Sequence, residues 1–246
     1  MKLVTGIAMG IVVVAVSIFV WSNELFYIMH PGRESMQYEG EILFPDTQTT
    51  VTKEGIVRNP ESLLVLVNKQ RRLPSSYVPP DLTIPNVRFS FNGDKEKMKL
   101  RKEAAEELAA LFQAGEKQDI YLFAVSAYRS YDRQKSLYTM YQQKEGKEIA
   151  AASSAVAGTS EHQTGLAVDI SAQSTRFLLD VSFATTKEGK WLQENAHKFG
   201  FIIRYPEYKE EITGYTYEPW HIRYVGEPHA RYLYERRLTL EEVMQK

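Results

Sequence analysis

The stretch SEHQTGLAVDIS, residues 160–171, starts as a polar loop containing a glycine and continues as an alternating apolar segment. In that segment Leu166, Val168 and Ile170 fall on one face of a β-strand, whereas Asp169 falls on the other. His162 comes shortly before the strand, seven residues ahead of Asp169. The pattern predicts a strand with an apolar face toward the core and a carboxylate near a histidine on the opposite face.

The segments around this stretch predict a domain that mixes helices and strands. Helical apolar spacing, with Leu100, Ala104, Leu108 and Leu111 on one face, is clearest at 97–118. Further helices are expected after a cap at Ser130, at 190–200 and at 227–246, where residues 239–242 form a capping-box pattern. Strands are expected at 62–70, 120–125 and 220–224.

The second expected helix, after Ser130, carries Leu137 and Met140 on its apolar side. Arg129 therefore falls at a strand-to-helix junction. In the last strand, Trp220, Ile222 and Tyr224 alternate with His221 and Arg223, so His221 lies on the polar face, as Asp169 does on its own strand.

The N-terminal sequence predicts three regions. Residues 3–21 form an uncharged apolar run about as long as the roughly 20 residues that a membrane-spanning helix needs. This run is a membrane anchor or a signal peptide, and the bulky residues that follow it favour the anchor. Residues 22–60 read as a linker and residues 61–246 as the working domain. Because Lys2 precedes the span, we expect a single-pass protein in the cell membrane with its domain outside.

Composition narrows the chemistry. The 246 residues carry a formal net charge of −1. The chain therefore lacks the basic excess that would indicate a nucleic-acid partner. The chain has no cysteine, which excludes disulfides, thiolate metal sites and a cysteine nucleophile. Any metal must therefore be held by histidine and carboxylate groups.

Three residues form a candidate metal site: His162, Asp169 and His221. Catalytic zinc takes three protein ligands of these types and leaves a fourth position for water. The alternative is that the histidines are surface or hydrogen-bonding residues and that the aspartate caps a turn. Spacing alone leaves both interpretations open.

Two further side chains belong to the candidate site. Glu218 comes three residues before His221 and could act as a general base beside a metal, or it could be a solvated loop acid. Arg129 could stabilise an oxyanion or bind a carboxylate, or it could form a surface ion pair.

Three motifs together resemble the VanY-type D-alanyl-D-alanine carboxypeptidases and the related LdcB-type L,D-carboxypeptidases. They are SAYRSYDRQ at 126–134, SEHQTGLAVDIS at 160–171 and EPWHIRYVG at 218–226. The resemblance covers about residues 62–237. It implies an α+β fold of the hedgehog and D,D-peptidase kind, with a small, mostly antiparallel sheet, packed helices on one side and a Zn²⁺ ion in an open cleft on the other.

The resemblance also implies a role for each motif residue. His162, Asp169 and His221 match the zinc ligands of that family, Glu218 its catalytic base, and Arg129 the group that polarises the scissile carbonyl. Contacts with the terminal D-residue and its carboxylate are implied for Gln134, Ser160 and Ser126. Ala127 stands where the family has glycine, a small-for-small exchange.

The implied activity is removal of the C-terminal D-alanine from peptidoglycan stem peptides. From the N-terminal apolar run we expect the enzyme to be tethered to the membrane, and we expect it to be a monomer. The motifs do not separate D,D from L,D cleavage; we favour D,D, which trims the pentapeptide, with L,D trimming of the tetrapeptide as the alternative. A second alternative is a non-catalytic zinc-containing module that binds the cell wall.

Overall fold

The computed structural model describes residues 44, 51–146 and 154–244. These residues belong to one compact unit, Ile42–Lys246. The expected membrane segment at 3–21 and most of the expected linker lie outside the described residues. Within the described part of the chain, no helix has the length and apolar character needed to span a membrane.

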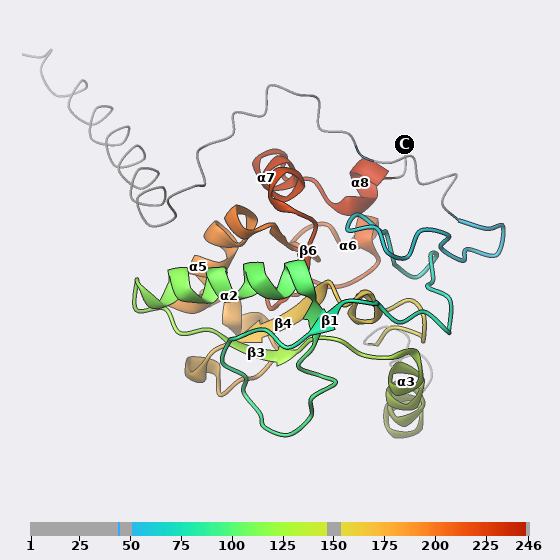
Figure 1. Ribbon diagram of the computed structural model, residues 1–246, viewed down its shortest axis with the longest axis horizontal. Helices are drawn as coiled ribbons and strands as arrows, with labels where there is room; N and C mark the ends of the chain where they lie inside the picture. Colours follow the sequence, from blue (N-terminus) through green and yellow to red (C-terminus); the bar gives the residue numbers. More distant parts are fainter. Residues whose placement is uncertain (1–43, 45–50, 147–153, 245–246) are drawn as a thin grey trace, which may run out of the picture. The chain divides into compact units, whose positions relative to one another are not determined.

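A four-stranded antiparallel sheet forms the centre of this unit (Figure 1). Its strands, in spatial order, are β3 (Phe123–Ser126), β4 (Ala167–Ser171), β6 (His221–Tyr224) and β5 (Phe201–Ile203). The first three confirm strands expected from the sequence. The edge strand β5 was not predicted, because three residues are too few to show a period. A two-stranded sheet pairs β1 (Leu82–Thr83) with β2 (Leu100–Arg101).

The register of the central sheet brings polar residues from three strands into one row. Ser126 of β3 lies opposite Asp169 of β4, and Asp169 lies opposite His221 of β6. A bulge between Ala124 and Ser126 shifts the end of β3. The predicted alternation is confirmed, but both faces of β4 and β6 are buried. The polar row is therefore an interior feature and does not face solvent.

The helices are α2 (Lys102–Glu116), α3 (Tyr131–Glu145), α5 (Lys187–Asn195), α6 (Glu210–Thr213), α7 (Glu227–Arg236) and α8 (Leu240–Met244). Four 3-10 turns complete the described elements: η1 (Glu161–Thr164), η2 (Gln173–Thr175), η3 (Val181–Thr185) and η4 (Ala196–Phe199). Helices α2, α5 and α7, labelled in Figure 1, each contact η4.

Helix α2 confirms the prediction made from its spacing, whereas α3 confirms only the helix itself. Leu100, at the entrance to α2, and Leu108 and Leu111 within it are fully buried. In α3, by contrast, Met140 is half exposed. Ser130 occupies the N-cap position of α3, but its side chain makes no capping hydrogen bond.

The prediction of a strand at 62–70 is wrong. Residues 64–67 are buried, but in this segment only an isolated bridge between Asn68 and Arg71 forms. The guanidinium of Arg223 donates to the carbonyl oxygens of Leu63 and Val65, each at 2.9 Å. Side-chain donors thus satisfy carbonyls that a partner strand would otherwise bind.

The helix expected to close the chain is broken in two. Arg237 ends α7 with a φ of 54°, in the left-handed region, and α8 starts three residues later. The capping box predicted at the second start is confirmed. The Thr239 amide donates to Glu242 Oε2 at 2.8 Å, and the Glu242 amide donates to Thr239 Oγ1 at 3.3 Å. This local signal starts a new helix after the turn.

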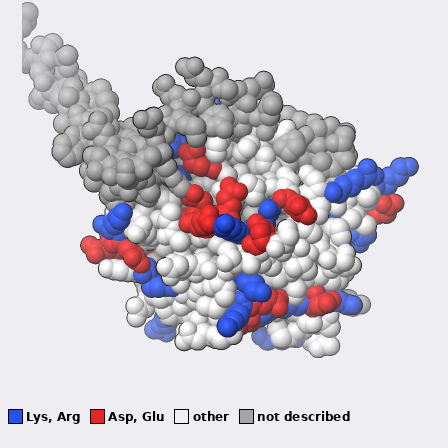
Figure 2. Space-filling model, in the orientation of Figure 1, with Lys and Arg blue, Asp and Glu red and all other residues white. Residues whose placement is uncertain are grey.

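Charged side chains of both signs lie side by side on the face shown in Figure 2. Close ion pairs include Arg133–Asp94 at 2.6 Å and Lys209–Glu242 at 2.9 Å. This mixture agrees with the net charge of −1. On this face, basic side chains do not form the continuous field that nucleic-acid binding would use.

A buried histidine away from the polar row gives a prediction about acid stability. The ring of His197 in η4 stacks on Tyr234 at a centroid distance of 3.7 Å. Burial, helped by the positive charges of Lys198 and Arg231, lowers the pKa of His197 to about 3. Between pH 6.5 and 3 the unfolded chain then binds the extra proton. Lowering the pH therefore reduces the free energy of unfolding, by roughly 1.4 kcal/mol per pH unit from this group.

We expect His197→Phe, which keeps a stackable ring, to flatten this dependence. Urea unfolding of both proteins at pH 7, 6 and 5 measures it. Equal slopes for the two proteins would show that His197 does not contribute.

Candidate metal centre

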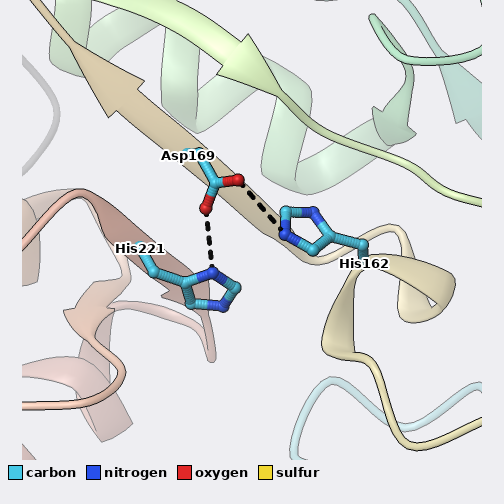
Figure 3. A group of neighbouring side chains, drawn as sticks. All are labelled: His162, Asp169 and His221. Carbon is cyan, nitrogen blue, oxygen red and sulfur yellow. Dashed lines mark hydrogen bonds and ion pairs between the residues drawn. The ribbon is translucent and has the colours of Figure 1, made fainter. Parts of the chain in front are cut away.

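Three potential metal ligands converge from separate parts of the fold. His162 comes from η1, Asp169 from β4 and His221 from β6 (Figure 3). Their ligand atoms all lie within 4.8 Å of one another, and all three residues are buried. The structure thus brings together residues that are far apart in the sequence, because the sheet register pairs Asp169 with His221.

The two imidazole rings present different nitrogens to the carboxylate between them. His162 Nδ1 donates to the carbonyl oxygen of Ala127 at 2.7 Å, which leaves Nε2 facing Asp169 Oδ2 at 3.3 Å. His221 turns its Nδ1 to Asp169 Oδ1 at 2.9 Å. Figure 3 shows both rings directed at the same carboxyl group. The inward-facing ligand atoms are therefore one Nε2, one Nδ1 and one carboxylate.

The electrostatics of this cluster suit a cation. Burial alone would raise the pKa of the Asp169 carboxyl, but the neighbouring histidines hold it well below its usual range. Burial lowers the pKa of His162, which favours the neutral, metal-binding imidazole. Two imidazole nitrogens and one carboxylate form a donor set of the kind that catalytic zinc uses. The residues present therefore fit Zn²⁺.

Glu218 lies beside this cluster without belonging to it. Its Oε2 is 3.9 Å from His221 Nδ1, and its side chain keeps 23% exposure. The backbone amide of Glu218 donates to the Tyr205 carbonyl at 3.0 Å, which fixes the turn before β6. Burial raises the pKa of the Glu218 carboxyl to about 7, although the nearby His221 opposes this. A carboxyl group with that pKa can accept and return a proton near neutral pH.

Arg129 reaches the cluster from the junction between β3 and α3, as its position in the sequence predicts. Its guanidinium donates to Gln134 Oε1 at 2.8 Å and to Ser126 Oγ at 3.1 Å. Its backbone amide donates to the His162 carbonyl at 3.2 Å. Burial lowers the pKa of Arg129, and the negative charge of Asp169 counteracts this. The guanidinium is thus a fixed cation beside the candidate metal ligands.

The residues expected to contact substrate are found nearby, and the protein itself uses some of their polar atoms. Gln134 is buried, and its Nε2 donates to the Ala155 carbonyl at 2.6 Å. Both ends of its amide therefore have partners, one of which is Arg129. Ser160 is buried directly before η1. Substrate contacts by Gln134, Ser160 and Ser126 stay predictions.

Other residues of the site were missed by the sequence analysis. The ring of Tyr205 lies 5.0 Å from that of His221, and the ring of Tyr215 lies 4.5 Å from that of Tyr205, tilted by 32°. Two fully buried arginines, Arg204 and Arg223, also lie close to the cluster. The available signal was an arginine among apolar residues, Arg204 directly after Phe201–Ile203 and Arg223 within β6, which indicates a buried ion pair.

A profile of the VanY family, described as D-alanyl-D-alanine carboxypeptidase, matches residues 97–227. This range contains all eight site residues that the sequence predicts. The chain is 52% identical to the "Putative carboxypeptidase YodJ" of Bacillus subtilis (strain 168) over 190 residues, which is 77% of this chain and 70% of that protein.

Solved structures are similar as well. One is the LdcB LD-carboxypeptidase, described as revealing the molecular basis of peptidoglycan recognition. It is 51% identical to this chain, with a TM-score of 0.75. The match covers 78% of this chain and 89% of the LdcB chain. A second is a mutant of the vancomycin-resistance D,D-pentapeptidase VanY in complex with Zn(II), with 37% identity and a TM-score of 0.58. The match covers 73% of this chain and 97% of the VanY chain.

Proposed function

Because the chain belongs to the D-alanyl-D-alanine carboxypeptidase (VanY) family, we propose that it is a zinc carboxypeptidase that removes the C-terminal D-alanine from peptidoglycan stem peptides. One observation carries this proposal. His162, Asp169 and His221 converge in a buried cluster with Glu218 beside it. Such a set matches a hydrolytic metal site, and the presence of a base distinguishes it from a site that only binds.

Each side chain has a distinct role in the proposed hydrolysis. Bound zinc would supply a Lewis acid that polarises the scissile carbonyl and lowers the pKa of a water molecule to near 7. Glu218 takes a proton from the attacking water and gives it to the leaving amine of D-alanine. Arg129, held in place by Gln134 and Ser126, stabilises the negative charge that develops on the carbonyl oxygen.

Two substrates fit this chemistry, and they differ in the residue before the terminal D-alanine. The 51% identity to the LdcB LD-carboxypeptidase favours L,D cleavage, which converts tetrapeptide to tripeptide. The family description and the 37% identity to a D,D-pentapeptidase favour D,D cleavage of the pentapeptide, the alternative preferred in the sequence analysis, although the motifs themselves do not separate the two. We propose L,D cleavage as the main activity, because the likeness to the L,D enzyme is greater in both identity and TM-score.

Release of D-alanine from the two peptides tests both the proposed carboxypeptidase activity and its L,D specificity. The full-length chain, loaded with zinc in a mild detergent, is incubated with a tetrapeptide ending in one D-Ala and a pentapeptide ending in D-Ala-D-Ala. Release mainly from the tetrapeptide supports L,D cleavage, and release mainly from the pentapeptide supports D,D cleavage. A zinc-loaded protein that releases D-alanine from neither would contradict the enzymatic proposal in favour of a binding module.

We further propose that residues 3–21 anchor the peptidase on the outer side of the cell membrane. The support is the uncharged apolar run that follows Lys2. A protease added to intact protoplasts should remove a C-terminal epitope tag. Protection of the tag would place the domain inside.

The contact between Gln134 and Arg129 gives a further prediction. Gln134→Ala removes the acceptor that holds one guanidinium nitrogen, and a hydrogen bond to a charged group contributes about 1.5–3 kcal/mol. We expect D-alanine release to fall on the order of 10-fold, with zinc content unchanged. Gln143→Ala, an exposed position on the same helix, is the matched control. Equal rates of D-alanine release for the two variants would show that Gln134 does not contribute to the reaction.

A further inference from the structure

A buried network of four charged residues lies behind the metal cluster. Its members are Glu161, Arg204, Arg223 and Glu241, each at most 1% exposed. Arg204 donates to Glu161 at 2.7 Å and to both carboxylate oxygens of Glu241 at 2.8 and 2.6 Å. Arg223 donates to Glu161 at 2.7 Å. Two positive and two negative charges balance, which is the condition under which charges can be buried.

The two carboxylate oxygens of Glu161 have different surroundings. Oε1 accepts both arginine hydrogen bonds, from Arg204 and Arg223. Oε2 is buried and points at Nε2 of His221 at 3.5 Å. Among the described residues, neither of these two atoms has a conventional hydrogen-bond partner. Buried polar atoms are seldom left unpaired, so each is the natural partner of the other.

We propose that Glu161 is a positioning residue for the metal site: its Oε2 accepts a hydrogen bond from the Nε2–H of His221, so that Nδ1 is the nitrogen presented to the metal. This inference rests on the metal role proposed for His221. A metal-binding histidine generally donates its second ring N–H to a fixed acceptor, which sets the tautomer and the orientation of the ring. His162 is held in the corresponding way by the Ala127 carbonyl at 2.7 Å, through its Nδ1.

The surrounding network keeps the Glu161 carboxylate from turning. Arg204 is held from the other side by Glu241 of α8. Arg223 is held by the carbonyl oxygens of Leu63 and Val65. Elements distant in sequence thus converge on one carboxylate. Rotation of this group would break both arginine contacts, so Oε2 stays directed at His221.

Glu161→Gln gives a sharp test, because it should reverse the tautomer. The two arginines only donate, so they will select the amide oxygen and turn the NH₂ group toward His221 Nε2. Nε2 must then accept, and the ring proton moves to Nδ1, the nitrogen that faces the metal. We expect zinc affinity, measured by competition with a chromophoric chelator, to fall about 10- to 100-fold.

Glu241→Gln is the matched control, because it removes the same charge from the same network. Glu241 accepts hydrogen bonds from Arg204 and Asn68. Among the described residues, no hydrogen bond or ion pair joins Glu241 to His221. Both variants should lose stability, but only Glu161→Gln should lose zinc affinity by this amount. Equal losses of affinity would show that the network acts through folding alone and would overturn the proposal.

A measurement on the unmodified, full-length protein does not depend on either variant folding. Nitrogen-15 NMR of the zinc-loaded chain in detergent should show His221 protonated at Nε2. Protonation at Nδ1 would overturn the proposal. A protein that binds zinc with this tautomer but releases no D-alanine would contradict the proposed function and leave the role of Glu161 intact. A protein that binds no zinc would contradict both.

Discussion

Glu218→Gln should lower the rate of D-alanine release on the order of 10²- to 10⁴-fold while leaving zinc bound, because a positioned general base contributes about that factor. Glu218 lies outside the ligand cluster, with its Oε2 3.9 Å from His221 Nδ1. Burial raises the pKa of its carboxyl to about 7, which suits transfer of a proton in both directions. Glutamine keeps the size of the side chain and cannot accept the proton. The predicted loss is therefore chemical.

The measurement combines turnover of the preferred stem peptide with the zinc content of the same samples. Glu207→Gln, an exposed acid in the same connection between β5 and β6, is the matched control and should retain full activity. Undiminished turnover in Glu218→Gln would rule out Glu218 as the base. Loss of zinc together with activity would make it a ligand instead.

Local sequence signals predicted the elements that depend on local interactions. The buried face of α2 follows from its apolar spacing, and the capping box at Thr239 and Glu242 needs only residues within one turn. The segment 62–70 has the composition of a strand, yet Arg223, far away in the sequence, satisfies its carbonyls. No local pattern contains that information.

The site divides in the same way. The predicted metal ligands lie on or next to strands whose alternation was readable, so their convergence follows once the sheet is paired. The acceptor behind His221 was not predicted, although Glu161 lies inside the decisive stretch at 160–171. Its role depends on two arginines and on α8, and a charged residue in a loop gives no sign of burial. Sequence thus shows which groups can bind a metal, while the structure shows what holds them.

Asp169→Asn should abolish both zinc binding and peptidase activity. The carboxylate lies between the two histidines, 3.3 Å from His162 Nε2 and 2.9 Å from His221 Nδ1, and it is the only anionic member of the ligand set. An amide of the same shape is a neutral and much weaker ligand, so the site would lose one of three donors and its negative charge. Activity should fall to background, a larger loss than that of the base alone.

Thermal unfolding separates loss of the metal from loss of the fold. Zinc in excess stabilises a protein that binds it in the native state, by RT ln(1 + [L]/Kd), which is about 2.7 kcal/mol at 100 times Kd. The unmodified chain should therefore unfold at a higher temperature with zinc and return to the lower value with a chelator. Asp132→Asn, an exposed position on α3, should keep that shift. Asp169→Asn should lose the shift and still unfold cooperatively; if it kept both the shift and the activity, the cluster of His162, Asp169 and His221 would not be the zinc site.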